Sequence, residues 1–485
     1  MSTKFLNGKK NGFRSMQTNQ IVSIEKVLLF IVYVFILSVI GNSCTETQDL
    51  HWKNVDKILL KIIPPEFPNR EFDITDYGAV GDGKTISTAA FQRAINDCNQ
   101  AGGGKVVVPA GIYLTGAIHL KSNVNLYVSK NSTILFSKDL NDYLPIVHTR
   151  FEGVECMNYS PFIYVFEQEN IAITGSGTLD GQAGEDNWWS WKGRDEYGWK
   201  DGQPNGLDES EALYQMAEEG IPINERIFGP GHELRTNFIQ PYKCKNVLID
   251  SIHVFRSPMW VIHPVLCENV TVQNVTVNSH GPNNDGCNPE SSKNVLIQNC
   301  FFDTGDDCIA IKSGRNAEGR RINVSSENIL IRNCTMRDGH GGVVIGSEMS
   351  GNVYNVYIEE CHMDSPNLER ALRIKTNSLR GGIVENVFMR NCQIGQVSDA
   401  ILRVNFRYGQ GDTGNFTPVV KNIYLKNLVS KKSRYAFYLD GYERSPITNI
   451  QVEDCRFDGV KEGNILNNYS GLVMKNTYIN GKLQK

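Results

Sequence analysis

The chain has 485 residues, a formal net charge of −4 and 21% charged residues. This balance excludes the basic surface expected of a nucleic-acid-binding protein and the composition of a disordered chain. Twelve cysteines in this length are too few for a disulfide scaffold. The length allows two or three domains, unless the fold is an elongated repeat.

The first 44 residues are predicted to be an export segment. Several basic residues precede an apolar run at 27–40, which has the length of a signal peptide and is short for a membrane-spanning helix. The run is followed by Gly-Asn-Ser-Cys at 41–44, which resembles a bacterial lipoprotein processing site with Cys44 lipidated. Plain secretion and an uncleaved anchor are the alternatives.

A lipid on Cys44 would attach the protein to a membrane. We therefore expect export to the periplasm or outer membrane of a Gram-negative-type bacterium, and secretion otherwise. Residues 45–70 are interpreted as a linker and residues 71–485 as one folded domain.

The domain is predicted to begin with a strand and a capping helix. The strand is expected at 72–77 and a second apolar run at 105–109. Between them, residues 88–101 place Phe91, Ile95 and Cys98 on one helical face, and three glycines follow. Because a solenoid needs its open end covered, we interpret this helix as an N-terminal cap.

One pattern recurs through most of the remaining chain: an asparagine, an aliphatic residue and a short alternating run. The asparagines are Asn246, Asn269, Asn294, Asn328, Asn355, Asn386, Asn422 and Asn449, at spacings of 23, 25, 34, 27, 31, 36 and 27 residues. Such periods indicate a solenoid, and the units lack the paired amphipathic helices of helical repeats. The sequence therefore predicts an all-β parallel β-helix.

The sixth residue after each asparagine is a small hydrophobe. These residues are Ile252, Val275, Cys300, Cys334, Cys361, Cys392, Leu428 and Cys455. Equivalent positions on stacked coils lie about 4.8 Å apart, so we expect an inward-facing ladder rather than disulfides. A metal–thiolate site would require closely spaced Cys-x-x-Cys pairs, which the sequence lacks.

Residues 183–233 interrupt the repeat and are rich in Trp, Asp, Glu and Gly. We interpret them as a loop insertion beside the helix, where insertions in repeat proteins often form the binding face.

Aligning the repeats brings polar residues into columns. Ile311, Ile345, Ile374 and Val404 end four successive strand runs. Five residues before the first two lie Asp306 and His340, which are thus predicted to be neighbours on adjacent coils. Arg373 and Lys375 flank Ile374 and should project to the same side.

Two acids, Asp306 and Asp307, follow a glycine, and Asp285 belongs to the preceding coil. An acid cluster of this kind suits hydrolysis of a glycosidic bond, which needs one group to protonate the leaving oxygen and another to activate water. Nearby Arg and Lys side chains would bind a substrate carboxylate. Taken singly, the acid pair could be a solvated turn, and His340 or the Arg-Ile-Lys run could be structural; their shared face argues against that.

Four short blocks in order resemble glycoside hydrolase family 28, the polygalacturonase family of single-stranded right-handed parallel β-helices. The blocks are Asn283-Asn284-Asp285, Gly305-Asp306-Asp307, Gly339-His340-Gly341 and Arg373-Ile374-Lys375. Asn284 stands where the family usually has Thr. The resemblance extends from about residue 72 to residue 459.

The resemblance implies inverting hydrolysis of α-1,4-linked galacturonic acid without a metal or other cofactor. Asp306 would be the general acid, and Asp285 and Asp307 would hold and activate water. His340 would orient this group. Arg373 and Lys375 would bind the galacturonate at the cleavage point, and Asn283 and Tyr408 would also contact the substrate.

The expected substrate is a pectic polysaccharide or oligogalacturonide. The insertion at 183–233 favours exo action because it could close one end of the cleft. The alternatives are a hydrolase of rhamnogalacturonan or another decorated pectin, a Ca²⁺-dependent pectate lyase and a non-catalytic glycan-binding β-helix. The oligomeric state stays open.

Overall fold

The structure is a computed structural model that describes residues 52–484. The chain divides into two compact units, residues 1–58 and 59–485. Residues 52–59, within the predicted linker, are helical. The predicted export segment and Cys44 lie outside the described residues. No helix in the described part of the chain is long and apolar enough to cross a membrane.

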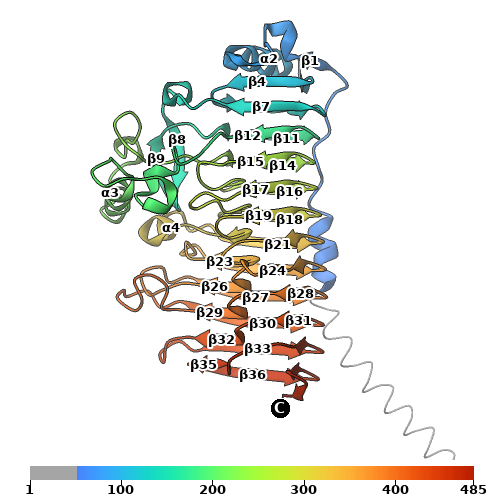
Figure 1. Cartoon of the computed structure of the whole chain (residues 1–485), viewed down its shortest axis with the longest axis vertical. Helices are drawn as coiled ribbons and strands as arrows, with labels where there is room; N and C mark the ends of the chain where they lie inside the picture. Colours follow the sequence, from blue (N-terminus) through green and yellow to red (C-terminus); the bar gives the residue numbers. More distant parts are fainter. Residues whose placement is uncertain (1–51, 485) are drawn as a thin grey trace, which may run out of the picture. The chain divides into compact units, whose positions relative to one another are not determined.

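The second unit is a stack of coils that form three lengthwise faces (Figure 1). In residues 52–484 the first face is a 13-stranded parallel sheet. Its strands are β1 (Glu71–Asp73), β3 (Gly104–Val108), β6 (Val124–Val128), β11 (Glu169–Gly175), β14 (Lys245–Asp250), β16 (Glu268–Gln273), β18 (Lys293–Gln298), β21 (Ser326–Arg332), β24 (Val353–Glu359), β27 (Ile383–Arg390), β30 (Val419–Lys426), β33 (Ile447–Glu453) and β36 (Tyr469–Lys475).

The second face is a 14-stranded sheet in the same described range. All its neighbours are parallel except the last pair. Its strands are β2 (Asp82–Ile86), β4 (Gly111–Thr115), β7 (Ser132–Phe136), β12 (Thr178–Asp180), β15 (His253–Phe255), β17 (Thr276–Ser279), β19 (Phe301–Thr304), β22 (Thr335–Met336), β25 (His362–Met363), β28 (Gln393–Gln396), β31 (Val429–Lys432), β34 (Arg456–Phe457), β37 (Tyr478–Ile479) and β38 (Lys482–Leu483).

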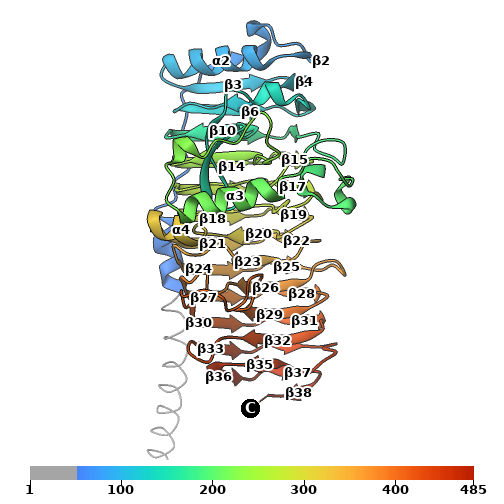
Figure 2. The ribbon, with the colours of Figure 1, turned by 90° about the vertical axis from the view of Figure 1, so that its left-hand side faces the viewer.

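The third face consists of two shorter parallel sheets, joined by isolated bridges through Ile262 and Cys287. Figure 2 shows its longer part running down the middle of the molecule. The shorter sheet contains β5 (Ile118–His119), β10 (Ile163–Phe166) and β13 (Ile239–Tyr242); the longer one contains β20 (Ile309–Ile311), β23 (Val343–Gly346), β26 (Arg370–Lys375), β29 (Ala400–Asn405), β32 (Tyr435–Asp440) and β35 (Ile465–Asn467). The predicted fold, an all-β right-handed parallel β-helix, is confirmed.

The helices within residues 71–484 lie at the N-terminal end and on one side of the coils (Figure 1). They are the α-helices α2 (Thr88–Gln100), α3 (Leu207–Glu218) and α4 (Asn316–Ile322), and the 3₁₀ helices η1 (Ile74–Tyr77), η2 (Leu140–Tyr143), η3 (Ser190–Lys192), η4 (Asp195–Tyr197) and η5 (Ile223–Glu225). A hairpin of β8 (Val147–Phe151) and β9 (Val154–Asn158) lies beside them.

The capping helix α2 buries Phe91, Ile95 and Cys98, as predicted. The strand predicted at 72–77 is wrong beyond Asp73. There the Asp73 carboxylate accepts the Thr75 backbone N–H at 2.8 Å and caps η1, so the chain turns into a helix. The helix α2 is followed by Gly103, whose φ is 106° and where a Cβ would lie 2.5 Å from the Asn123 carbonyl oxygen.

The recurring asparagines form a hydrogen-bonded ladder along the solenoid. Each has a positive φ, for example 58° at Asn355. The Asn355 amide donates to Asn328 at 3.2 Å and accepts from Asn386 at 3.0 Å. Asn tolerates this left-handed conformation better than other non-glycine residues, and its amide can both donate and accept. This explains why the repeat uses asparagine.

The predicted inward ladder is also confirmed. Ile252, Val275, Leu428 and the cysteines aligned with them are at most 2% exposed. The cysteines among the described residues are all free and buried. They pack as small hydrophobes.

A second, smaller core attaches the hairpin and the insertion to the solenoid. Phe151 and Val154 of the hairpin pack with Leu213 of α3, Phe228 and Trp260. The insertion at 183–233 therefore folds together with the β8–β9 hairpin, which has no counterpart in the predicted elements.

Candidate active site

Three carboxylates meet where the coils enter the third face. Asp306 and Asp307 lie between β19 and β20, and Asp285 lies one coil earlier, after β17. One carboxylate oxygen from each of the three lies within 4.8 Å of the other two. The register predicted from the repeats is confirmed: Ile311 pairs with Ile345, Ile345 with Ile374, and Ile374 with Val404.

Asp285 is 1% exposed and accepts a hydrogen bond from the Asn288 amide at 2.7 Å. Burial, followed by repulsion from Asp306, raises its pKa well above the usual range. These surroundings favour the neutral form of Asp285.

Asp306 is the most exposed of the three acids and faces the cleft. Its Oδ1 lies 3.0 Å from Nδ1 of His340 and accepts the Asp307 backbone N–H at 3.0 Å. Burial alone would raise its pKa, but the His340 hydrogen bond and nearby cations outweigh this and lower it. The same contact raises the pKa of His340. The free Asp306 is thus ionised.

Asp307 is fully buried and is paired with the two predicted substrate-binding cations. Lys375 Nζ lies 2.7 Å from its Oδ2, and an Arg373 Nη1 lies 3.9 Å from its Oδ1. Lys375 is itself only 6% exposed. Lys375 therefore holds Asp307 directly, whereas Arg373 lies farther from the Asp307 carboxylate.

Tyr408 lies beside both cations, with its ring centroid 5.3 Å from the Arg373 guanidinium and from Lys375 Nζ. Asn283 is held from the other side. Its amide oxygen accepts from Lys192 Nζ at 2.8 Å and from Arg235 Nη2 at 2.6 Å. Asn283 therefore links the insertion to the acid cluster.

Asn284, the position that departs from the family pattern, is buried and points away from the acids. Its Oδ1 accepts the Ser279 hydroxyl at 2.5 Å and the Gly281 N–H at 2.9 Å. The side chain stabilises the turn that carries Asp285.

Lys312 is a site residue that the sequence did not single out. It is 3% exposed, and its Nζ lies 3.6 Å from Asp285 Oδ2, 3.0 Å from Glu348 Oε2 and 4.5 Å from the Trp260 ring centroid. Its signal was its position directly after Ile311, which matches that of Lys375 after Ile374. With Lys375 it supplies two ammonium groups next to the acids, where a metal ion would meet repulsion.

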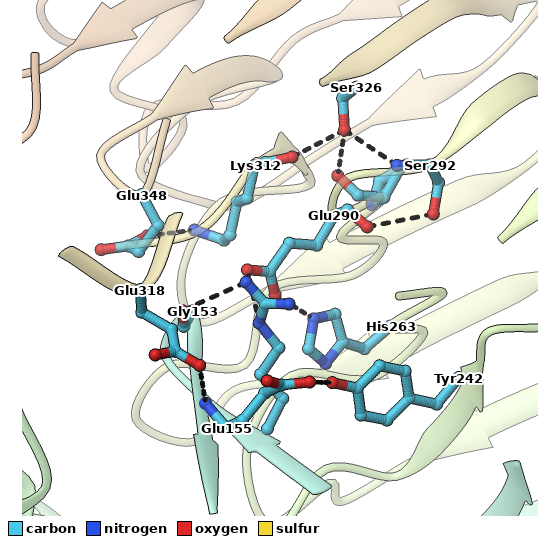
Figure 3. A network of polar contacts seen from close by, with 12 residues as sticks. Gly153, Glu155, Tyr242, His263, Glu290, Ser292, Lys312, Glu318, Ser326 and Glu348 are labelled. Atoms are coloured by element: carbon cyan, nitrogen blue, oxygen red, sulfur yellow. Dashed lines mark hydrogen bonds and ion pairs between the residues drawn. The ribbon is translucent and has the colours of Figure 1, made fainter. Parts of the chain in front are cut away.

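A buried ion network lies behind Lys312 (Figure 3). Arg150 of β8 pairs with Glu290 at 3.0 Å, and His263 Nε2 lies 2.8 Å from the same carboxylate. Glu155 of β9 contacts Tyr242 of the solenoid. These contacts fix the hairpin on the coils that carry the acids.

The acids open into a cleft of about 340 Å³. Among the described residues that line it, six Lys and Arg side chains face four Asp and Glu side chains. The cations are Lys192, Arg194, Lys312, Arg315, Lys375 and Arg380, and the acids are Glu152, Asp285, Asp306 and Glu348. A protein of net charge −4 thus has a cationic cleft, which suits a polyanion.

A second acid cluster lies outside this cleft. His280, Asp303 and Asp338 could offer three ligand atoms, but the His280 ring already lies 2.9 Å from Asp303, and Asp338 accepts from Ser365 and Asn367.

Comparisons with known proteins show the family of this chain. The family model "Glycosyl hydrolases family 28" matches residues 231–476, and "Rhamnogalacturonase A/epimerase, pectate lyase-like" matches residues 72–140. The crystal structure of an exopolygalacturonase from Thermotoga maritima superposes with a TM-score of 0.87 and 47% identity, covering 89% of this chain and 97% of that one.

Relatives by sequence include a probable polygalacturonase of Vitis vinifera, 27% identical over 89% of this chain and 81% of that protein. An exo-poly-α-D-galacturonosidase of Dickeya chrysanthemi is 27% identical over 71% of this chain and 59% of that protein. The family match spans the three acids, His340, Arg373 and Lys375, and the chain therefore belongs to glycoside hydrolase family 28.

Proposed function

We propose that this protein is an exo-acting polygalacturonase that hydrolyses α-1,4-galacturonosyl linkages. The observation that carries the proposal is the cluster of three carboxylates in a cationic cleft, one side of which is lined by Lys192, Arg194 and Tyr197 of the insertion. The exopolygalacturonase from Thermotoga maritima supports the exo mode.

In the proposed reaction Asp306 protonates the glycosidic oxygen. Because the free Asp306 is ionised, it must first gain a proton. A bound galacturonate adds negative charge beside Asp306 and excludes water, and both effects raise its pKa. The buried Asp285, whose raised pKa favours its neutral form, has a carboxylate oxygen within 4.8 Å and can supply this proton.

Once it has released its proton, Asp285 can accept one from water that it holds together with Asp307. Lys312 stabilises the carboxylate of Asp285, and Lys375 stabilises that of Asp307. Arg373, beside Tyr408, is placed to bind the substrate carboxylate at the cleavage point.

Inversion of configuration is proposed from the family resemblance. Acids within 4.8 Å lie closer than the roughly 6.5–9.5 Å typical of two-carboxylate inverting enzymes. ¹H NMR of the first product should detect the β-anomer before mutarotation, and an initial α-anomer would contradict inversion.

Digestion of homogalacturonan tests the exo mode. We expect galacturonic acid or a single short product at early times, without a chelator effect and without ultraviolet absorbance. A ladder of oligomers would rule out strict exo action, and an unsaturated product would indicate a lyase. Cleavage of rhamnogalacturonan at a comparable rate would favour the decorated-pectin alternative.

We also propose that the protein is exported and lipidated on Cys44, as the sequence of the first 44 residues suggests. Fractionation of expressing bacteria should find the protein with membranes. Cys44→Ser should release it to the soluble periplasm or medium. An unchanged membrane fraction for the variant would favour an uncleaved anchor.

A further inference from the structure

Two arginines at the far end of the cleft are not used by the proposed chemistry. Arg315 follows β20 and directly precedes α4, and Arg380 follows β26. Both line the same cleft as Asp306, on the side formed by loops that leave the third face.

Arg315 is held by the segments that close the cleft. Its guanidinium carbon lies 3.5 Å from the ring centroid of Tyr214 in α3. Its Nη1 lies 3.3 Å from Glu152 Oε2, in the β8–β9 turn, and 3.8 Å from Glu348 Oε1. A planar guanidinium fixed in this way is pre-oriented for a planar anion.

Arg380 is 3% exposed and is oriented by one strong contact, from its Nη1 to the Asn316 side-chain oxygen at 2.6 Å. Burial and repulsion from Arg315 lower its pKa to about 10. Within the described residues, the Nε atoms of Arg315 and Arg380 have no hydrogen-bond partner. The Glu348 carboxylate is shared between Lys312 and Arg315, so a single anion here is divided between two cations.

The neighbouring oxygens suit sugar hydroxyls. Glu152 and Glu348 offer carboxylate acceptors, and Ser347 lines the cleft with a hydroxyl. A hexuronate carries one carboxylate and several hydroxyl donors, which matches a pair of guanidinium groups flanked by two carboxylates.

We propose that Arg315 and Arg380 form a second carboxylate-binding site, which recognises the acid group of the terminal, non-reducing galacturonate. The inference rests on the proposed function and adds to it a preference for two consecutive free carboxylates, one here and one at Arg373. We assign this site to the terminal sugar because Glu152 of the β8–β9 turn and Tyr214 of α3, which are hydrogen-bonded to each other, both border Arg315.

The test compares trigalacturonate with the same oligomer methyl-esterified only on its non-reducing residue. For the wild-type enzyme we expect kcat/KM to fall about 10- to 100-fold on esterification, the value of a lost charge-assisted hydrogen-bond pair. Arg380→Gln and Arg315→Gln should lose a similar factor on the free acid and then cleave acid and ester within about 2-fold of each other. Arg337→Gln, which changes an exposed arginine outside the cleft, is the control.

Equal cleavage of acid and ester by the wild type would overturn the inference, and so would variants that keep the full wild-type preference. If the Gln variants do not fold, the wild-type comparison and Arg380→Lys, which retains the charge, still decide. A wild-type enzyme that releases no galacturonate from trigalacturonate would instead contradict the proposed function.

Discussion

The Nδ1 atom of His340 lies 3.0 Å from Oδ1 of Asp306, and this contact joins two coils whose residues are 34 positions apart. It lowers the pKa of the cleft-facing acid, whereas burial and repulsion from Asp306 raise the pKa of Asp285. The free site therefore favours a carboxylate at Asp306 and the neutral form of Asp285.

From the His340–Asp306 contact we expect the wild type and His340→Gln to differ in stability in a pH-dependent way. The raised pKa of His340 stabilises the fold below its unfolded value of about 6.5, and this contribution is lost as the pH rises through the folded value. The lowered pKa of Asp306 stabilises the fold above its unfolded value of about 3.9, and this contribution is lost on acidification. The difference in Tm should thus be largest near pH 5. A difference that grows toward pH 9 would contradict it.

Asp306→Asn should lower turnover of galacturonan by about 10²- to 10⁴-fold, because it removes the proton donor. An aryl galacturonide with a good leaving group, such as the 4-nitrophenyl compound, needs little protonation, so the variant should lose much less activity on it. Asp285→Asn is the comparison. If that variant, and not Asp306→Asn, is rescued by the aryl substrate, Asp285 is the general acid.

Asp285→Asn and Asp307→Asn should separate activity from stability. Asp285 has a raised pKa, so its ionisation costs stability above its unfolded value of about 3.9, and the neutral amide should leave Tm at pH 7 equal or higher. Asp307→Asn leaves buried Lys375 without its anion and should cost about 3 kcal/mol. Both variants should be inactive. Differential scanning calorimetry gives the comparison, and equal loss of Tm in both would contradict it.

The asparagine ladder predicts an order of stability for changes at Asn355. Asn355→Ala loses two ladder hydrogen bonds and places alanine at a φ of 58°, so it should cost about 2–4 kcal/mol. Asn355→Gly loses the same bonds without the backbone strain and should be about 1 kcal/mol less harmful. Urea unfolding of both variants measures this. An alanine variant as stable as the glycine variant would show that the conformation costs little.

Much of the fold could be predicted because a β-helix converts sequence spacing into spatial neighbours. The recurring asparagines and the small hydrophobes six residues later define each coil, and coils stack in register. The spacing alone therefore placed Asp306, His340 and Arg373 on successive coils. The strand predicted at 72–77 is wrong beyond Asp73 because the Asp73 side chain caps a 3₁₀ helix there.

What the sequence by itself determined was thus the solenoid, its register and the acids and cations on one face, since strand periodicity and parallel stacking act over one coil. The tertiary structure decided the direction in which the pKa of each acid is shifted, because that depends on burial and on the charged groups nearby. It also decided how the cleft is closed. Glu152 meets Arg315 across 163 residues through a hairpin outside the repeat, and no spacing in the chain encodes that contact.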